Sequence, residues 1–115
     1  MNYNKKKELV LEGVSASKGV AEGVVRVLFP KDDMSSFNEG DVLVTSMTDP
    51  SMVLVMGMVS AIITDTGGIT SHAAILSREM GVPCVVNTTS GTKELSDGDK
   101  VYIDGDTGKI YKILS

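Results

Sequence analysis

The sequence predicts a single α/β domain whose β-sheet mixes parallel and antiparallel strands. At 115 residues the chain has the length of one typical domain. Short apolar runs near both ends indicate strands, whereas the middle of the chain alternates strands with helices. Hydrophobic residues make up 42% of the chain and charged residues 23%, which is ordinary for a globular protein. We expect the domain to span residues 9–115 and residues 1–8, which include a run of lysines, to form a flexible N-terminal tail.

The N-terminal part of the domain is predicted to be rich in strands. Leu9–Val14 and Val20–Phe29 are expected to be strands joined by the segment 15–19. The second of them places polar side chains among its valines, which favours a sheet with one face in water. The polar stretch 30–40 is expected to be a loop with, at most, a helical turn.

The central part is predicted to alternate strands and helices. The expected elements are a strand over 41–46, a helix over 50–58, a strand over 60–64, a helix over 71–80 and a strand over 83–86. Asp49 and Pro50 form a helix-start pair, because aspartate can cap free amides and proline suits the first helical position. Gly81 and Pro83 mark the end of the second helix.

The C-terminal part is predicted to be a β-hairpin. A polar loop leads into two segments with alternating apolar residues, 100–104 and 109–113. The turn Gly105–Gly108 separates them and has the composition of a hairpin turn.

Composition argues against several classes of partner. The formal net charge is −4, aromatic residues make up 4% of the chain and tryptophan is absent, so a nucleic-acid partner is not expected. No apolar run approaches the ~20 residues of a membrane span, so no membrane contact is expected. One cysteine, Cys84, excludes an internal disulfide and fits a cytoplasmic location, and we expect it to be a small core residue.

The sole histidine of the chain, His72, is the strongest candidate for chemistry. It follows an apolar strand, the pair Gly67-Gly68 and a hydroxyl-bearing helix start at Ser71. Free amides at a helix N-terminus can donate hydrogen bonds to phosphate oxygens, and the helix dipole favours an anion there. Because a histidine imidazole is largely neutral at pH 7, it can act as a nucleophile. The pattern therefore predicts that His72 accepts and holds a phosphoryl group.

The neighbours of His72 suit this chemistry. Gly67 and Gly68 permit a positive φ and leave room for a phosphate or a partner to approach closely. Thr70 and Ser71 can either cap the helix or donate hydrogen bonds to an oxyanion. A lone histidine is more often structural, and a glycine pair is more often a plain turn, but their combination with a strand and a helix start favours a site.

Other chemistries fit this segment less well. A zinc site needs three or four clustered ligands, and the chain has one histidine and one cysteine, so no metal is expected. A Ser71–His72 dyad is disfavoured, because adjacent helical side chains point roughly 100° apart. The glycines precede no lysine, so they do not form a nucleotide-binding P-loop. Asp65 could orient the imidazole or cap the turn, and Arg78 is expected to be solvated or salt-bridged.

The segment Thr64–Ile75, continuing through Leu76–Val86, resembles the swivelling phosphohistidine domain of phosphoenolpyruvate (PEP)-utilising enzymes. This family includes PEP synthase, pyruvate phosphate dikinase and Enzyme I of the sugar phosphotransferase system, and the chain is most similar to the first two. The resemblance extends upstream through 40–50 and downstream through 97–108. It implies a compact β/β/α sandwich with a mixed sheet.

The resemblance also implies roles for individual residues. His72 matches the phosphorylated nucleophile and Thr70 matches the neighbouring catalytic hydroxyl, while Gly67 and Gly68 match the phosphate-binding loop. We also expect Ser71 to contact the phosphate. The family usually has arginine at the position of Ile69 and glycine at the position of Asn87.

The implied function is that of a phosphoryl carrier. In the full enzymes an ATP-grasp domain phosphorylates the histidine, and a barrel domain exchanges that phosphate with pyruvate or PEP, using magnesium. The mobile domain itself is expected to bind no cofactor. The chain would then be a phosphotransferase component that lacks the ATP-grasp and PEP-binding domains and takes them as partners. The alternative is a non-catalytic regulatory or scaffold module that binds a phosphotransfer enzyme.

Overall fold

A computed structural model describes residues 6–114 and confirms an α/β domain with a mixed sheet. The strands are β1 (Lys7–Glu12), β2 (Val14–Ser17), β3 (Val20–Val27), β4 (Val42–Thr45), β5 (Ala61–Thr64), β6 (Cys84–Val86), β7 (Lys100–Asp104) and β8 (Lys109–Ile113). The helices are the 3-10 turn η1 (Pro50–Met52), α1 (Val53–Met56), α2 (His72–Met80) and α3 (Gly91–Glu94).

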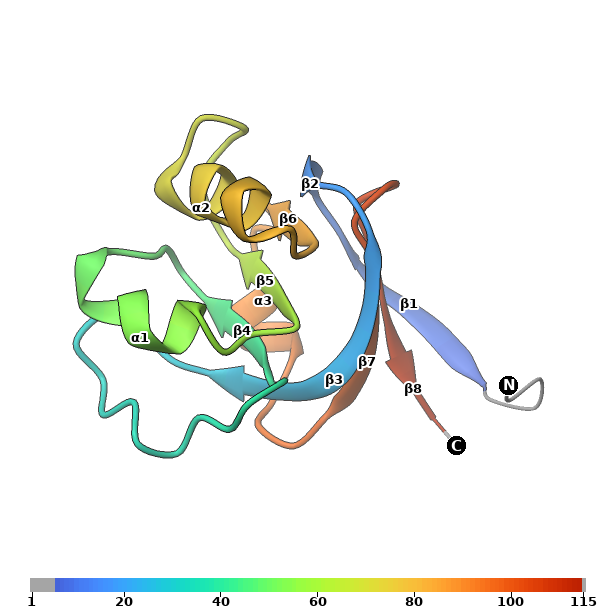
Figure 1. Ribbon diagram of the computed structural model, residues 1–115. Coiled ribbons are helices and arrows are strands. Elements are labelled where there is room, and N and C mark those ends of the chain that lie inside the picture. Colours follow the sequence, from blue (N-terminus) through green and yellow to red (C-terminus); the bar gives the residue numbers. More distant parts are fainter. Residues whose placement is uncertain (1–5, 115) are drawn as a thin grey trace.

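The eight strands form one sheet in the order β1-β8-β7-β3-β4-β5-β6-β2. Strands β3, β4, β5 and β6 run parallel, and all other neighbours pair antiparallel. Strand β3 belongs to both halves, since its residues 20–24 pair with β7 and its residues 25–27 pair with β4. Figure 1 shows β3 as a long curved strand that links the antiparallel half to the half covered by α1 and α2.

The sheet curves until its two edges nearly meet at Gly13. Edge strands β1 and β2 are separated in the chain by this residue alone, and its N–H donates to the carbonyl of Gly108 at 2.8 Å. A Cβ at this position would lie 2.4 Å from the carbonyl oxygen of Val86, so the close approach requires glycine. The expected strand Leu9–Val14 is therefore wrong in extent, because the chain bends at Gly13 and forms β2 where a connecting segment was predicted.

Two apolar clusters lie on opposite faces of the parallel strands. The cluster enclosed by the curved sheet comprises Leu11, Val25, Val42, Val44, Ala61, Ile63, Val85, Leu95, Val101, Ile103 and Ile110. The cluster beneath the helices comprises Ala16, Leu28, Phe37, Leu43, Met52, Val55, Met56, Val59, Ile62, Ala73, Ala74, Cys84 and Val86. Neighbours along one strand alternate between the clusters, as the strand period of two requires. The second cluster fixes α2 against β5 and β6.

The structure departs from the expected elements at the N-terminal end of the described chain and agrees with them at the C-terminal end. Lys7 pairs with Ile113 and Glu8 pairs with Lys112, so these two residues belong to β1 and not to a tail. Of the remainder of the expected tail, Lys6 accepts at its carbonyl from the Leu114 N–H at 2.8 Å, and residues 1–5 lie outside the described residues. The hairpin of β7 and β8 forms where it was predicted.

Helix structure also differs in two places. The predicted helix over 50–58 is a 3-10 turn followed by the four-residue α1, although Asp49 caps it and Pro50 opens it as expected. Helix α3 was not predicted, because its first turn is capped from a distant part of the chain. The Asp65 carboxylate accepts hydrogen bonds from the Thr92 N–H at 2.9 Å and from the Thr92 hydroxyl at 2.6 Å.

Candidate phosphoryl-acceptor site

The candidate site lies where the parallel strands end. Strands β4, β5 and β6 run in the same direction, so the segments that follow them meet at one edge of the sheet. In open α/β sheets, ligands commonly bind outside this carboxyl edge. The segment 46–49 follows β4, and the glycine-containing loop 65–71 follows β5 and leads into α2.

His72 is the first residue of α2 and its side chain is exposed. Ser71 is the N-cap: its backbone is extended (φ −69°, ψ 162°) and its hydroxyl accepts from the Ala74 N–H at 3.4 Å. Within residues 6–114, no hydrogen bond uses the backbone N–H of His72 or Ala73. These two amides are therefore available to an anion beside the imidazole.

A hydrogen bond at 2.8 Å joins the Nδ1 atom of His72 to the hydroxyl oxygen of Thr48. Thr48 is 8% exposed, so the hydroxyl that holds the ring is itself fixed in the protein interior. The Nε2 atom of His72 makes no hydrogen bond to any described residue. In the tautomer with its proton on Nδ1, that N–H donates to Thr48 and Nε2 keeps a free lone pair. Sequence reasoning missed Thr48, because its contact with His72 depends on β4 and β5 being neighbours.

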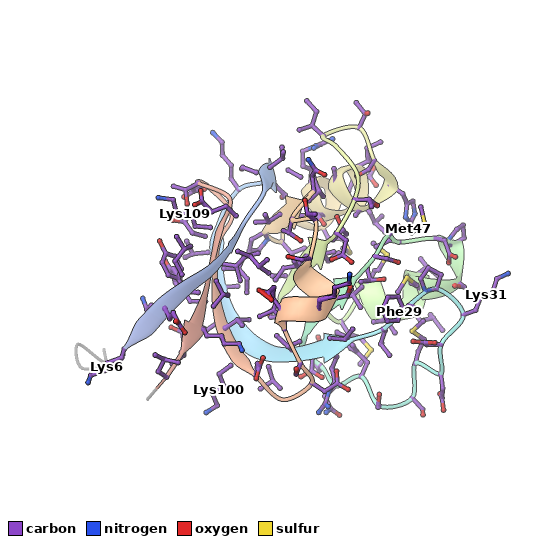
Figure 2. The ribbon with its side chains drawn as sticks, turned by 180° about the vertical axis from the view of Figure 1, so that it is seen from behind. Lys6, Phe29, Lys31, Met47, Lys100 and Lys109 are labelled. Atoms are coloured by element: carbon purple, nitrogen blue, oxygen red, sulfur yellow. The ribbon has the colours of Figure 1, made fainter. Side chains whose placement is uncertain are left out.

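A cleft of about 170 Å³ opens beside the imidazole. This volume is several times the ~30 Å³ that one water occupies in the liquid, so a phosphoryl group has room there. The lining residues are Met47, Thr48, Thr64, Thr66, Gly67, Ser71, His72 and Ala73. Figure 2 shows Met47 on the same side of the molecule as Phe29 and Lys31, away from Lys6 and Lys109.

The predicted site residues divide into two groups. Gly67, Ser71 and His72 line the cleft, whereas Gly68 and Thr70 are exposed in the loop and do not line it. Gly67 has a φ of +104°, and a Cβ there would lie 3.2 Å from the Ser71 side chain, so this position requires glycine. Gly68 does not have a positive φ and nothing lies within 4 Å of a Cβ built on it, so the expected backbone reason for glycine holds at Gly67 only.

Hydroxyls of the buried Thr45 and Thr64 and of the exposed Thr66 hold the segments around the cleft, and sequence reasoning did not identify them. The Thr45 hydroxyl donates to the carbonyl of Met47 at 2.9 Å, and the Thr66 hydroxyl donates to the carbonyl of Ser46 at 2.9 Å. The Thr64 hydroxyl donates to the carbonyl of Thr66 at 2.5 Å. Thr45 and Thr64 each end a parallel strand, and this placement is the signal in the sequence that could have revealed them.

Asp49 brings a negative charge to the rim of the site. The Ser51 hydroxyl and backbone N–H donate to its carboxylate and hold the pKa of Asp49 below its ordinary value. The charges of Lys31 and His72 act in the same direction. The Asp49 carboxylate is therefore ionised at neutral pH, and an anionic phosphoryl donor that approaches the imidazole meets one negative charge there.

Three other candidates from the sequence have structural roles. Asp65 caps α3 and so does not orient the imidazole. Arg78 is solvent-exposed, as expected, and its guanidinium also donates to the backbone carbonyls of Ala16 at 2.8 Å and Ile69 at 2.7 Å. Cys84 is buried in the core as expected, and burial raises the pKa of its thiol from 9.0 to about 11, which keeps it protonated.

Asn87 occupies a position where the backbone favours glycine. Its φ is +56°, in the left-handed region that asparagine tolerates better than most residues. The difference from the family's usual glycine is therefore compatible with the same loop shape.

Over residues 6–114, no group of three or more His, Cys, Asp or Glu residues is arranged to hold a metal ion. None of the helices in the described part of the chain has the length and apolar character needed to cross a membrane.

Comparison with known proteins places this geometry in a family. Residues 37–108 match the family profile of the PEP-utilising enzyme, mobile domain. A probable phosphoenolpyruvate synthase of Pyrococcus horikoshii is 53% identical over 105 residues, which are 91% of this chain and 13% of that protein. The phosphoenolpyruvate synthase of Deinococcus radiodurans is 46% identical over 109 residues, which are 92% of this chain and 14% of that protein. The chain thus spans a small part of the relatives it matches.

Solved structures agree with this assignment. The solution structure of an Enzyme I protein is 32% identical, with a TM-score of 0.60 over 70% of this chain and 34% of that one. The aconitase X structure of Thermococcus kodakaraensis, at 23% identity, shares the fold alone, with a TM-score of 0.67 over 96% of this chain and 99% of that one. The matched segment contains the glycine loop, His72 and Thr48. The chain belongs to the mobile-domain family of PEP-utilising enzymes.

Proposed function

We propose that this domain carries a phosphoryl group on the Nε2 atom of His72, between a site that uses ATP or PEP and an acceptor such as pyruvate. The observation that carries the proposal is the arrangement of the imidazole: it is exposed, it is anchored through Nδ1 to Thr48, and it lies at the N-terminus of α2. A free nucleophilic nitrogen, a fixed ring and adjacent amide donors are what a reversible phosphoryl acceptor needs.

The chemical step is a displacement at phosphorus. The Nε2 lone pair forms the N–P bond, the bond from phosphorus to the donor oxygen breaks, and the leaving group takes that electron pair. The proton stays on Nδ1, where it donates to Thr48, so the phosphorylated ring is an imidazolium whose positive charge lies beside the negative phosphoryl oxygens. The N–H groups of His72 and Ala73 can donate to the phosphoryl oxygens, and the Ser71 hydroxyl proton is also available.

Partner domains would supply the donor and acceptor sites. The named relatives are phosphoenolpyruvate synthases, of which this chain spans 13% to 14%, so an ATP-grasp domain and a PEP- or pyruvate-binding barrel are the proposed partners. Magnesium would enter with the nucleotide or with PEP in those domains. Met47 and Ile69 are more than half exposed beside the site, and we expect a docked partner to cover them.

Phosphorylation in trans tests the proposal. The chain is mixed with a phosphoenolpyruvate synthase whose own mobile-domain histidine is replaced by alanine, together with magnesium and either ATP or PEP. Intact-mass measurement is expected to show one added phosphoryl group, which acid removes and base does not. If neither donor adds phosphate while the two proteins bind each other, the chain is a scaffold module and the carrier proposal is wrong.

Thr48→Val is expected to slow the phosphorylation of His72 by about fivefold, because the loss of one hydrogen bond of about 1 kcal/mol releases the ring from its orientation. Thr48→Ser, which keeps the hydroxyl, is the matched control and should stay within about twofold of the parent chain. The rates are measured from the mass spectra, and ring-nitrogen chemical shifts report the tautomer. Equal rates for valine and serine at this position would show that the hydrogen bond does not position the ring.

A further inference from the structure

Arg78 makes contacts that its charge alone does not explain. It lies in α2, six residues after His72, and its two terminal nitrogens donate to the carbonyl of Ala16 in β2 and to the carbonyl of Ile69 in the glycine loop. Both acceptors are neutral backbone groups, and neither is the carboxylate of an ion pair. One guanidinium thereby ties the edge strand, the helix that carries His72 and the loop that precedes it.

The glycine loop has few other anchors between Thr66 and Ser71. One backbone hydrogen bond within it joins the Ser71 N–H to the carbonyl of Gly68 at 3.0 Å. The Ile69 side chain is 58% exposed and so adds little packing. A loop with two adjacent glycines and little apolar contact has many accessible conformations unless hydrogen bonds restrict it.

The contact with Ile69 fixes the peptide plane that leads into the helix start. In a trans peptide the carbonyl of one residue and the N–H of the next point in opposite directions, so holding the Ile69 carbonyl toward Arg78 turns the Thr70 N–H away from it. That N–H makes no hydrogen bond with any described residue. The direction of this peptide therefore sets how the chain enters Ser71 and His72.

We propose that Arg78 is a positioning residue for phosphoryl transfer: its fork holds the glycine loop in the shape that receives the phosphoryl group before any donor arrives. The inference rests on the proposed function of His72. If the loop is already ordered, it does not have to rearrange while the phosphoryl group is transferred, and the free-energy barrier of the transfer is lower. Arginine suits the task because its planar fork reaches two acceptors at once, which a lysine ammonium on its flexible stem does not reproduce.

The test compares Arg78→Lys and Arg78→Gln with the parent chain in the phosphorylation assay in trans. Both variants are expected to lower the maximal phosphorylation rate by about tenfold to a hundredfold, with the half-saturating concentration of the donor enzyme changed by less than about twofold. Backbone amide exchange at Ser71, whose N–H donates to the Gly68 carbonyl within the loop, is expected to accelerate in both variants, while exchange in β4 and β5 stays as in the parent. Lys18→Gln is the matched control, because Lys18 lines the same groove as Arg78 and makes no hydrogen bond to the loop.

The outcomes separate the two proposals. If the parent chain accepts no phosphate, the function assigned to His72 fails, whatever Arg78 does. If the parent is phosphorylated and Arg78→Lys keeps its maximal rate within twofold, the positioning role is refuted. The positioning role would also be refuted if the Arg78 variants changed only the half-saturating concentration of the donor enzyme and Lys18→Gln changed it equally. That result would show that the positive charge of Arg78 attracts the partner and does not order the loop. Should Arg78→Gln unfold, Arg78→Lys, which retains the positive charge and the alkyl stem, decides the question.

Discussion

Replacing His72 with alanine is expected to abolish the acid-labile phosphorylation of this chain. No other histidine exists to take over the nitrogen–phosphorus bond, and the thiol of Cys84 is buried and protonated. The side chain of His72 is exposed, so the fold should survive, although the buried Thr48 hydroxyl loses its partner at a cost of about 1 kcal/mol. Intact-mass spectra before and after mild acid treatment, together with thermal unfolding, measure both effects.

Thr70→Ala is the control for this prediction, because it removes the exposed hydroxyl two residues before His72 in the chain and keeps the histidine. It should retain the acid-labile phosphate, at a reduced rate if the Thr70 hydroxyl contacts the donor. An acid-labile phosphate on His72→Ala equal to that of the parent would exclude His72 as the acceptor. A phosphate that withstands acid and disappears in Thr70→Ala would place the modification on the hydroxyl.

Gly13→Ala is expected to lower the free energy of unfolding by about 3 kcal/mol, near the upper end for overpacking a closely packed site. The added Cβ would lie 2.4 Å from the carbonyl oxygen of Val86 and 2.9 Å from side-chain atoms of Val85 and Thr88. Because the first of these is backbone, relief requires β2 to move away from β6 where the two edges of the sheet meet. The melting temperature should fall by roughly 10–20 °C.

Gly57→Ala provides the matched comparison for the glycine substitution. Its φ is −75° and the closest atom to an added Cβ is the Leu54 carbonyl oxygen at 3.6 Å, an ordinary contact. We expect stability to change by less than about 0.5 kcal/mol, with a small gain from the stiffer unfolded chain. Equal melting temperatures for Gly13→Ala and the parent would show that the sheet edges do not close as tightly as described.

Local sequence signals predicted the elements whose causes are local. The hairpin of β7 and β8 follows from alternation around a glycine-rich turn, and α2 ends at Gly81, which adopts the left-handed conformation with φ +73°. The bend at Gly13 and the formation of α3 could not be predicted in this way. The first depends on the carbonyl of Val86 lying against the bend, and the second depends on the Asp65 side chain capping Thr92.

The same distinction holds at the site. The strand, the glycine pair and the hydroxyl before His72 predicted the helix start and pointed to His72 as the candidate acceptor, because all of these are neighbours in the chain. The roles of Thr48 and Arg78 were not predicted, because their contacts join segments far apart in the sequence. Thr48 contacts His72 from the segment after β4. Arg78 contacts β2 and the glycine loop from α2. A carbonyl-bonded arginine also has no signature that separates it from a solvated one in the sequence. Supports of this kind become visible only when strand neighbours are known.

The position of the phosphate on the ring tests the carrier mechanism most directly. The chain, labelled with ¹⁵N in its histidine, is phosphorylated in trans and studied by long-range ¹H–¹⁵N correlation and ³¹P coupling. Since Thr48 engages Nδ1 at 2.8 Å, the phosphate is predicted on Nε2 of His72, with Nδ1 still protonated. A phosphate on Nδ1, or a ring that stays unmodified while the donor enzyme consumes its substrate, would contradict the mechanism.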